Sequence, residues 1–168
     1  MFRKTIKNRF QKCLFSGVIL ALLLACQRDD ICPEGTETTP LLVIEFYDAQ
    51  DLTRLKAVQG LVVQATGMEE AYIGPETTNS ISIPLRTDEN FTEYTFIYNS
   101  GSEDENEDKV TFSYSPDLEY LNRACGYKIN YSNLDVVVHQ DEDNWIQAQI
   151  IIQENIENET EAHISFTH

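Results

Sequence analysis

The chain has 168 residues and a formal net charge of −16, because 28 acidic residues outnumber 12 lysines and arginines. A field of this sign repels nucleic acid and anionic lipid surfaces, so the composition argues against a nucleic-acid-binding protein. It permits divalent cations or a basic partner, although a solvated acidic surface explains the charge equally well.

The first 25 residues have the pattern of an export signal. Five basic residues precede an apolar stretch from Cys13 to Ala25, and no acidic residue occurs before Asp29. This stretch is too short for a membrane-spanning helix, which needs about 20 residues, but it fits the core of a secretory signal peptide. We therefore predict that residues 1–25 are removed as a signal peptide.

The end of this stretch, residues 23–25 (LLA) followed by Cys26, resembles a bacterial lipobox. In lipoproteins the cysteine receives a diacylglycerol, and two or three acyl chains anchor stably where one chain does not. We predict lipidation of Cys26, with a secreted protein carrying a free Cys26 as the alternative. Residues 27–30 (QRDD) resemble the surface-export tag of Bacteroidetes-type lipoproteins, so the predicted location is the outer membrane, at its periplasmic face or the cell surface.

Two cysteines remain in the mature chain, Cys32 and Cys125. Outside the cytoplasm two cysteines most simply form one disulfide. It would close a loop of about 90 residues, worth about 4 kcal/mol in the chain-entropy model, and tie the segment beside the anchor to the domain. A metal site is the rival interpretation, but no CxxC or HxxxH spacing accompanies the two thiols.

Cleavage after residue 25 leaves 143 residues, enough for one domain. The signal peptide takes five of the 12 basic residues and no acidic ones, so the mature charge is 7 minus 28, or −21. We predict a lipidated tether over residues 26–39 and a single domain over residues 40–168.

From residue 40 onward apolar residues recur with period two, which predicts an all-β fold. Pro84 cannot donate a ladder hydrogen bond and indicates an edge or bulge, and residues 118–124 are predicted to form a helical turn. The predicted strand faces, in chain order, are Leu42, Ile44 and Phe46; Leu61, Val63 and Ala65; Ile81, Ile83 and Leu85; Tyr94, Phe96 and Tyr98; Val110, Phe112 and Tyr114; Tyr127, Ile129 and Tyr131; Leu134, Val136 and Val138; Ile146, Ala148, Ile150 and Ile152; and Ala162, Ile164 and Phe166.

Eight or nine short strands separated by polar turns favour an antiparallel two-sheet sandwich of immunoglobulin-like type. A closed barrel is the alternative, since both architectures solve the problem of exposed strand edges.

Four segments carry a resemblance to an uncharacterised family of Bacteroidetes-type lipoproteins: residues 29–32 (DDIC), 38–48 (TTPLLVIEFYD), 83–85 (IPL) and 123–127 (RACGY). The similarity covers most of the mature chain. It implies a small lipid-anchored β domain and no particular activity.

An acidic segment over residues 103–108 places Asp104, Asn106 and Asp108 in the alternation of the first ligands of a calcium loop. The pattern then fails, because Lys109 stands where an EF-hand needs glycine and Ser115 where it needs a bidentate glutamate. We predict a solvated hairpin loop, with weak calcium binding at the three residues as the alternative.

The sequence predicts no enzyme and no cofactor. Its histidines, His139, His163 and His168, lie late in the chain without a GxSxG elbow or a comparable nucleophile motif. Carboxylates are so plentiful that a pair such as Glu45 and Glu93 is no evidence for a glycosidase.

A binding module is therefore the favoured function, docking on an outer-membrane protein through a sheet face or an open edge. The alternative is glycan binding at the cell surface, which needs exposed flat rings. Trp145, the sole tryptophan, falls on the polar face with Gln147 and Gln149, although a ring that starts a strand is more commonly packed under a loop. Tyr72 could join it only if the fold brings the two loops together.

Overall fold

The computed structural model describes residues 31–168, so Cys26 and the predicted signal peptide lie outside the described residues. Residues 31–168 form ten strands and no helix, which confirms the predicted all-β class. In this range there is no helix of the length and apolarity that crossing a bilayer requires. The described residues divide into two compact units, a larger one of residues 37–120 and 127–168 and a smaller one of residues 31–36 and 121–126.

The strands are β1 (Leu42–Asp48), β2 (Asp51–Leu55), β3 (Val58–Ala65), β4 (Ile73–Thr78), β5 (Ser80–Ile83), β6 (Phe91–Tyr98), β7 (Asn106–Asn122), β8 (Gly126–Val138), β9 (Ala148–Ile151) and β10 (Ile164–Thr167).

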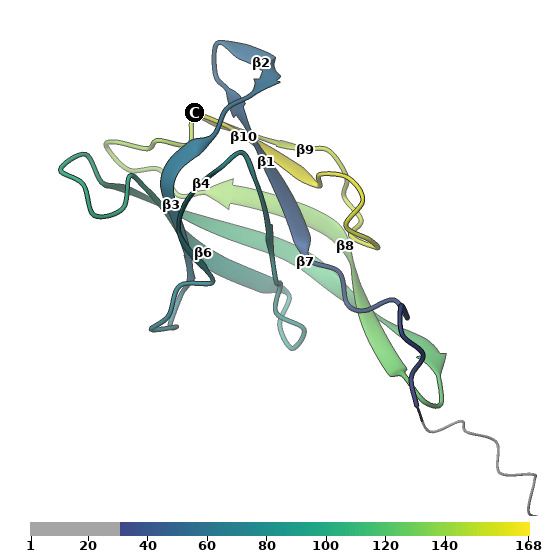
Figure 1. The fold of residues 1–168 in the computed structure, drawn as a ribbon. Helices are drawn as coiled ribbons and strands as arrows, with labels where there is room; N and C mark the ends of the chain where they lie inside the picture. Colours follow the sequence, from purple (N-terminus) through teal and green to yellow (C-terminus); the bar gives the residue numbers. More distant parts are fainter. Residues whose placement is uncertain (1–30) are drawn as a thin grey trace, which may run out of the picture. The chain divides into compact units, whose positions relative to one another are not determined.

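Two sheets build the larger unit, as in a β-sandwich (Figure 1). One has the strand order β2-β1-β10-β9, with β5 paired to β1, and the other has the order β4-β3-β6-β7-β8. β1 and β10 pair in parallel, whereas the pairs β1–β2, β1–β5, β9–β10, β3–β4, β3–β6 and β6–β7 are antiparallel. The sheets keep open edges, so the closed-barrel alternative is wrong.

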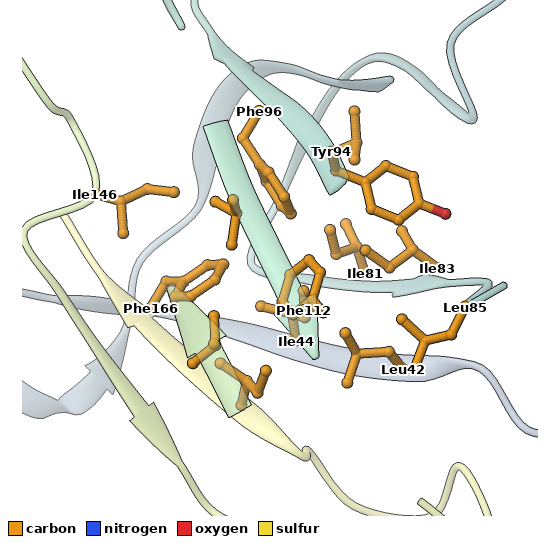
Figure 2. Close-up of a cluster of buried hydrophobic side chains, with 14 of the residues drawn as sticks. Leu42, Ile44, Ile81, Ile83, Leu85, Tyr94, Phe96, Phe112, Ile146 and Phe166 are labelled. Carbon is orange, nitrogen blue, oxygen red and sulfur yellow. The ribbon is translucent and has the colours of Figure 1, made fainter. Parts of the chain in front are cut away.

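The core lies between the facing sides of the two sheets, where alternate residues of β5, β6, the first half of β7 and the second half of β8 are buried. Figure 2 shows Phe166 of β10 pointing into one cluster with Phe96 of β6 and Phe112 of β7. The Phe96 and Phe166 ring centroids are 5.7 Å apart, and the rings meet edge to face. Such aromatic pairs add about 0.5–1.5 kcal/mol to the stabilisation that comes from burial alone.

The predicted helical turn over residues 118–124 is wrong, because β7 continues to Asn122. Side chains across the hairpin hold this part of β7 extended. Asn130 of β8 donates from Nδ2 to Glu119 at 2.7 Å, and Ser132 donates to Asp117 at 2.6 Å. Pairing with the neighbouring strand has therefore overridden the local helical preference.

A second difference concerns β8, which is one strand where two were predicted. Asn133 has a positive φ of 55°, a conformation that asparagine tolerates better than most residues. The burial pattern shifts at this point, so that Tyr131 and Leu134 are both buried although they are three residues apart. Tyr127, predicted to share a buried face with Tyr131, is 61% exposed.

The predicted buried face of the following strand is also wrong. Ile146 is buried, but Ile150 and Ile152 are exposed, and Ile151 packs against the core instead. The amide of Ile146 is held by the buried carboxylate of Asp108 at 2.7 Å. This contact turns Ile146 inward before β9 begins, so the pleat of β9 starts in a different phase.

Candidate functional site

β9 forms the open edge of its sheet. Residues 144–153 (NWIQAQIIIQ), which contain β9, include no charged residue, although 40 of the 168 residues are charged (12 basic and 28 acidic). The side chains of Ile150 and Ile152 are 49% and 51% exposed. Native proteins commonly protect sheet edges with charges or proline, and β9 has neither. Its backbone is therefore suited to pairing with a further strand.

A furrow of about 310 Å³ runs beside this edge on the outer face of the same sheet. Ser165 and Thr167 of β10 form its floor, since they alternate with the core residues Ile164 and Phe166 and so point away from the core. The short side chains of Ser165 and Thr167 leave room between taller neighbours on the adjacent strands. The furrow is lined by Tyr47, Leu52, Thr53, Ile150, Ile152, Ser165 and Thr167.

Charges near the furrow are satisfied within the molecule. The Tyr47 hydroxyl donates to Glu45 Oε2 at 2.7 Å, and this hydrogen bond raises the pKa of the Tyr47 phenol. The Asp48 carboxylate accepts from the Gln50 amide at 2.9 Å and pairs with Arg54; the hydrogen bond from Gln50 is the main cause of its lowered pKa. Asp48 is thus paired with a cation, whereas Glu45 keeps its negative charge. The furrow beside β9 is lined by uncharged residues, three of them aliphatic and four bearing a hydroxyl group.

The three calcium candidates do not converge on one site. Asp104 is exposed, whereas Asp108 is fully buried and accepts hydrogen bonds from the Ile146 amide at 2.7 Å and Asn144 Nδ2 at 2.9 Å. Burial raises the pKa of Asp108, and these two hydrogen bonds oppose the shift. Asn106 donates from Nδ2 to the carbonyl of Asp143 at 2.5 Å.

Asp108 and Asn106 therefore hold the turn that leads to β9, and residues 31–168 contain no cluster of metal-ligating side chains. The sequence carried a signal for this role. Asp108 alternates with Val110, Phe112 and Tyr114, the buried face of β7, so an acid at that position needs internal partners.

The two aromatic candidates occupy different environments. Trp145 is half-buried and donates from Nε1 to the Phe96 carbonyl at 3.1 Å, while its ring lies 5.7 Å from those of Tyr98 and His168. Tyr72 precedes β4 and is 48% exposed. Within the part of the chain that the structure describes, no aromatic contact joins Tyr72 to Trp145.

A polar cluster of Glu93, Thr111 and His139 resembles a nucleophile–base–acid set in composition but not in geometry. His139 Nε2 lies 2.8 Å from Thr111 Oγ1 and 3.8 Å from Glu93 Oε2. A proton relay needs the acid on one ring nitrogen and the nucleophile on the other, whereas here both face the same nitrogen. Glu45 belongs to β1, in the other sheet, so it does not pair with Glu93.

The predicted disulfide between Cys32 and Cys125 is present, within the smaller unit. In the larger unit, residues of the predicted tether contact β8. The Ile129 amide donates to Thr39 Oγ1 at 3.0 Å, and the buried amine of Lys128 lies 2.5 Å from a Glu37 carboxylate oxygen. The hydrogen bond to Glu37 is the main cause of the raised pKa of Lys128.

Comparison with protein families gives one match: residues 60–168 match the model of a family of unknown function (DUF6452). No curated protein and no solved structure matches the chain. The matched range begins in β3 and includes β9, the furrow wall at Ile150 and Ile152, and Cys125.

Proposed function

Because this chain belongs to the family of unknown function DUF6452, which brings no activity with it, we propose a function from the surfaces of the molecule and its leader sequence. The protein is a non-catalytic docking module of the cell envelope. It is held at the outer membrane by lipid on Cys26, and it binds an outer-membrane protein through the open edge of β9.

The anchoring part of the proposal rests on residues 1–30, with their basic block, apolar stretch and lipobox-like LLA before Cys26. The short QRDD tag supports a Bacteroidetes-type lipoprotein. A disulfide between Cys32 and Cys125 suits the oxidising compartment that such a protein enters.

The docking part rests on one observation: the edge strand β9 is uncharged, and Ile150 of β9 and Ile152 just after it are exposed beside the furrow. An extended segment that pairs with β9 would gain main-chain hydrogen bonds, while every second side chain would lie on the face that carries these isoleucines. An apolar partner strand would cover part of the surface that these isoleucines expose to water.

The glycan alternative has less support. A sugar platform needs a ring face in water, and the Trp145 ring is engaged by Tyr98 and His168, with its indole N–H satisfied by a main-chain carbonyl. Of the two aromatic candidates, Tyr72 and Trp145, only Tyr72 is among the exposed residues.

Site-specific crosslinking in living cells tests the docking surface. A photo-crosslinking residue in place of the exposed Gln149 of β9 should capture an outer-membrane protein, whereas the same residue in place of the exposed Glu107 of β7 should not. Adding Ile150→Lys should abolish the Gln149 adduct, because a lysine in this face opposes burial. Leu118→Lys is the matched control, because Leu118 is 67% exposed on β7. This variant should leave the Gln149 adduct intact. An adduct that survives Ile150→Lys would refute docking through β9.

The anchor is tested separately. Cys26→Ala should move the protein from the membrane pellet to the soluble fraction, and a variant that stays in the pellet refutes lipid anchoring at this residue. Protease treatment of intact cells then distinguishes the cell surface from the periplasmic face.

A further inference from the structure

A larger cleft, of about 670 Å³, lies where β3 ends and β6 begins. This volume is in the range of ligand pockets, which hold a predominantly apolar surface and a few polar groups. Met68 and Phe91 give it apolar walls that are 61% and 45% exposed. The cleft is lined by Ala65, Thr66, Met68, Pro84, Leu85, Arg86, Phe91, Thr92, Glu93 and Tyr94.

The segments around the cleft are acidic. Of the ten lining residues, Arg86 and Glu93 are the two charged ones, and the adjoining residues 69–70 and 88–89 add four acidic residues and no basic one. The Arg86 guanidinium is already occupied, since its Nη2 lies 2.9 Å and its Nε 3.2 Å from the two carboxylate oxygens of Asp88. A second carboxylate, of Glu89, lies 3.7 Å from Nη2. The one cation of this region is therefore neutralised by its own loop, and the surroundings of the cleft attract positive charge.

Glu93 brings a negative charge to the cleft itself. Its Oε1 accepts a hydrogen bond from Thr66 Oγ1 at 2.8 Å, and its Oε2 has a long contact of 3.4 Å with Thr111 Oγ1. No lysine or arginine of residues 31–168 pairs with Glu93, and its nearest basic group is the imidazole of His139 at 3.8 Å. With its side chain 27% exposed, Glu93 can accept a hydrogen bond from a cation outside the molecule.

The polar groups deeper in the cleft are satisfied internally. The Tyr94 hydroxyl donates to the Pro84 carbonyl at 2.6 Å, and Thr92 Oγ1 accepts from the Arg86 amide at 2.8 Å. An occupant therefore meets an apolar surface with one acceptor, Glu93, that lacks a cationic partner.

We propose that this cleft binds a segment of a partner protein in which an apolar side chain stands beside a lysine or arginine. The apolar side chain would lie against Met68 and Phe91, and the cation would reach Glu93 while its methylene stem covers the apolar wall. A free cation would leave the apolar walls in water, and a purely apolar ligand would leave Glu93 without a partner. The cleft is separate from the β9 edge. A negative result for peptide binding in the cleft would therefore not bear on the docking proposed at β9.

Fluorescence anisotropy with the purified full chain tests this proposal. The probe is a labelled peptide, Gly-Ser-Leu-Arg-Leu-Ser-Gly, compared with the same peptide carrying glutamate in place of arginine. We expect the arginine peptide to bind about tenfold more tightly, with the difference shrinking as salt is added. Equal binding of the two peptides would overturn the proposal. Complete displacement of the peptide by arginine amide at equal concentration would also overturn it, because the apolar contact would then contribute nothing.

Variants assign the binding to the cleft. Glu93→Gln keeps an acceptor for Thr66 and should lower the affinity for the arginine peptide about fivefold. Met68→Ser should also lower this affinity, because it removes part of the apolar wall. The exposed Glu107→Gln, on the neighbouring strand β7, changes the net charge equally and should leave binding unchanged. Equal effects of Glu93→Gln and Glu107→Gln would mean that the overall charge attracts the peptide, and this result would refute the site.

Discussion

Replacing Asp108 with alanine tests whether the buried carboxylate holds the turn that precedes β9. The substitution removes the acceptor for the Ile146 amide and for Asn144 Nδ2. A hydrogen bond to a charged group contributes about 1.5–3 kcal/mol, and the buried amide left without a partner costs about 1–3 kcal/mol. Burial of the carboxylate is itself unfavourable, as the raised pKa of Asp108 indicates. Removing the carboxylate removes this cost and so offsets part of the loss. We expect the free energy of unfolding to fall by about 3 kcal/mol.

Asp108→Asn is the matched comparison, since it keeps the size of the side chain and one carbonyl acceptor. Its amide group would face one of the two present donors, so we expect a smaller loss of about 1–2 kcal/mol. Urea unfolding followed by tryptophan fluorescence measures both variants, because Trp145 stands next to Ile146 and packs against the core.

Two results would refute this reasoning. A loss below about 1 kcal/mol for Asp108→Ala would mean that the carboxylate does not hold the turn. A calcium-induced rise in melting temperature that disappears in Asp108→Ala would mean that Asp108 is a metal ligand. We expect calcium to leave the melting temperature of the unsubstituted protein unchanged.

Three further predictions concern pH, the disulfide and the edge strand. Burial lowers the pKa of His163, whose Nδ1 accepts a hydrogen bond from the Val43 amide at 3.0 Å. Its contribution to stability is therefore complete above the unfolded pKa of about 6.5 and declines as pH falls toward the lowered folded value. Thermal scans from pH about 7 to about 5 should show this decline, and a His163→Gln variant that declines equally would contradict it. Cys125→Ser should cost up to about 4 kcal/mol in urea unfolding, and reductant should then have no further effect; a loss near zero would mean that the unfolded loop is not constrained. Ile150→Lys should change the free energy of unfolding by less than about 0.5 kcal/mol, because the side chain is half exposed, and a larger loss would invalidate it as a docking variant.

Period-two alternation was sufficient to predict the fold class and much of the core. Val110, Phe112 and Tyr114 are buried as predicted, because one face of an extended strand must be apolar when it packs on a second sheet. The disulfide was predictable for a different reason, since Cys32 and Cys125 are the two cysteines that remain after the predicted lipobox. Asp108 also fits the spacing of calcium ligands, which made it a candidate metal ligand. Its alternation with Val110, Phe112 and Tyr114 instead marks it as a buried residue.

The sequence by itself determined the β class, the faces of the regular strands and the Cys32–Cys125 pairing, because these follow from local periodicity and from a small choice of partners. Tertiary structure alone decided the parallel pairing of β1 with β10, whose partners Ile44 and Ile164 lie 120 residues apart. It also decided the phase of β9, through the contact between Asp108 and Ile146. The open edge and the acidic cleft follow from such long-range contacts, since strand order and loop neighbours depend on which distant segments pack together and not on the residues beside them in the chain.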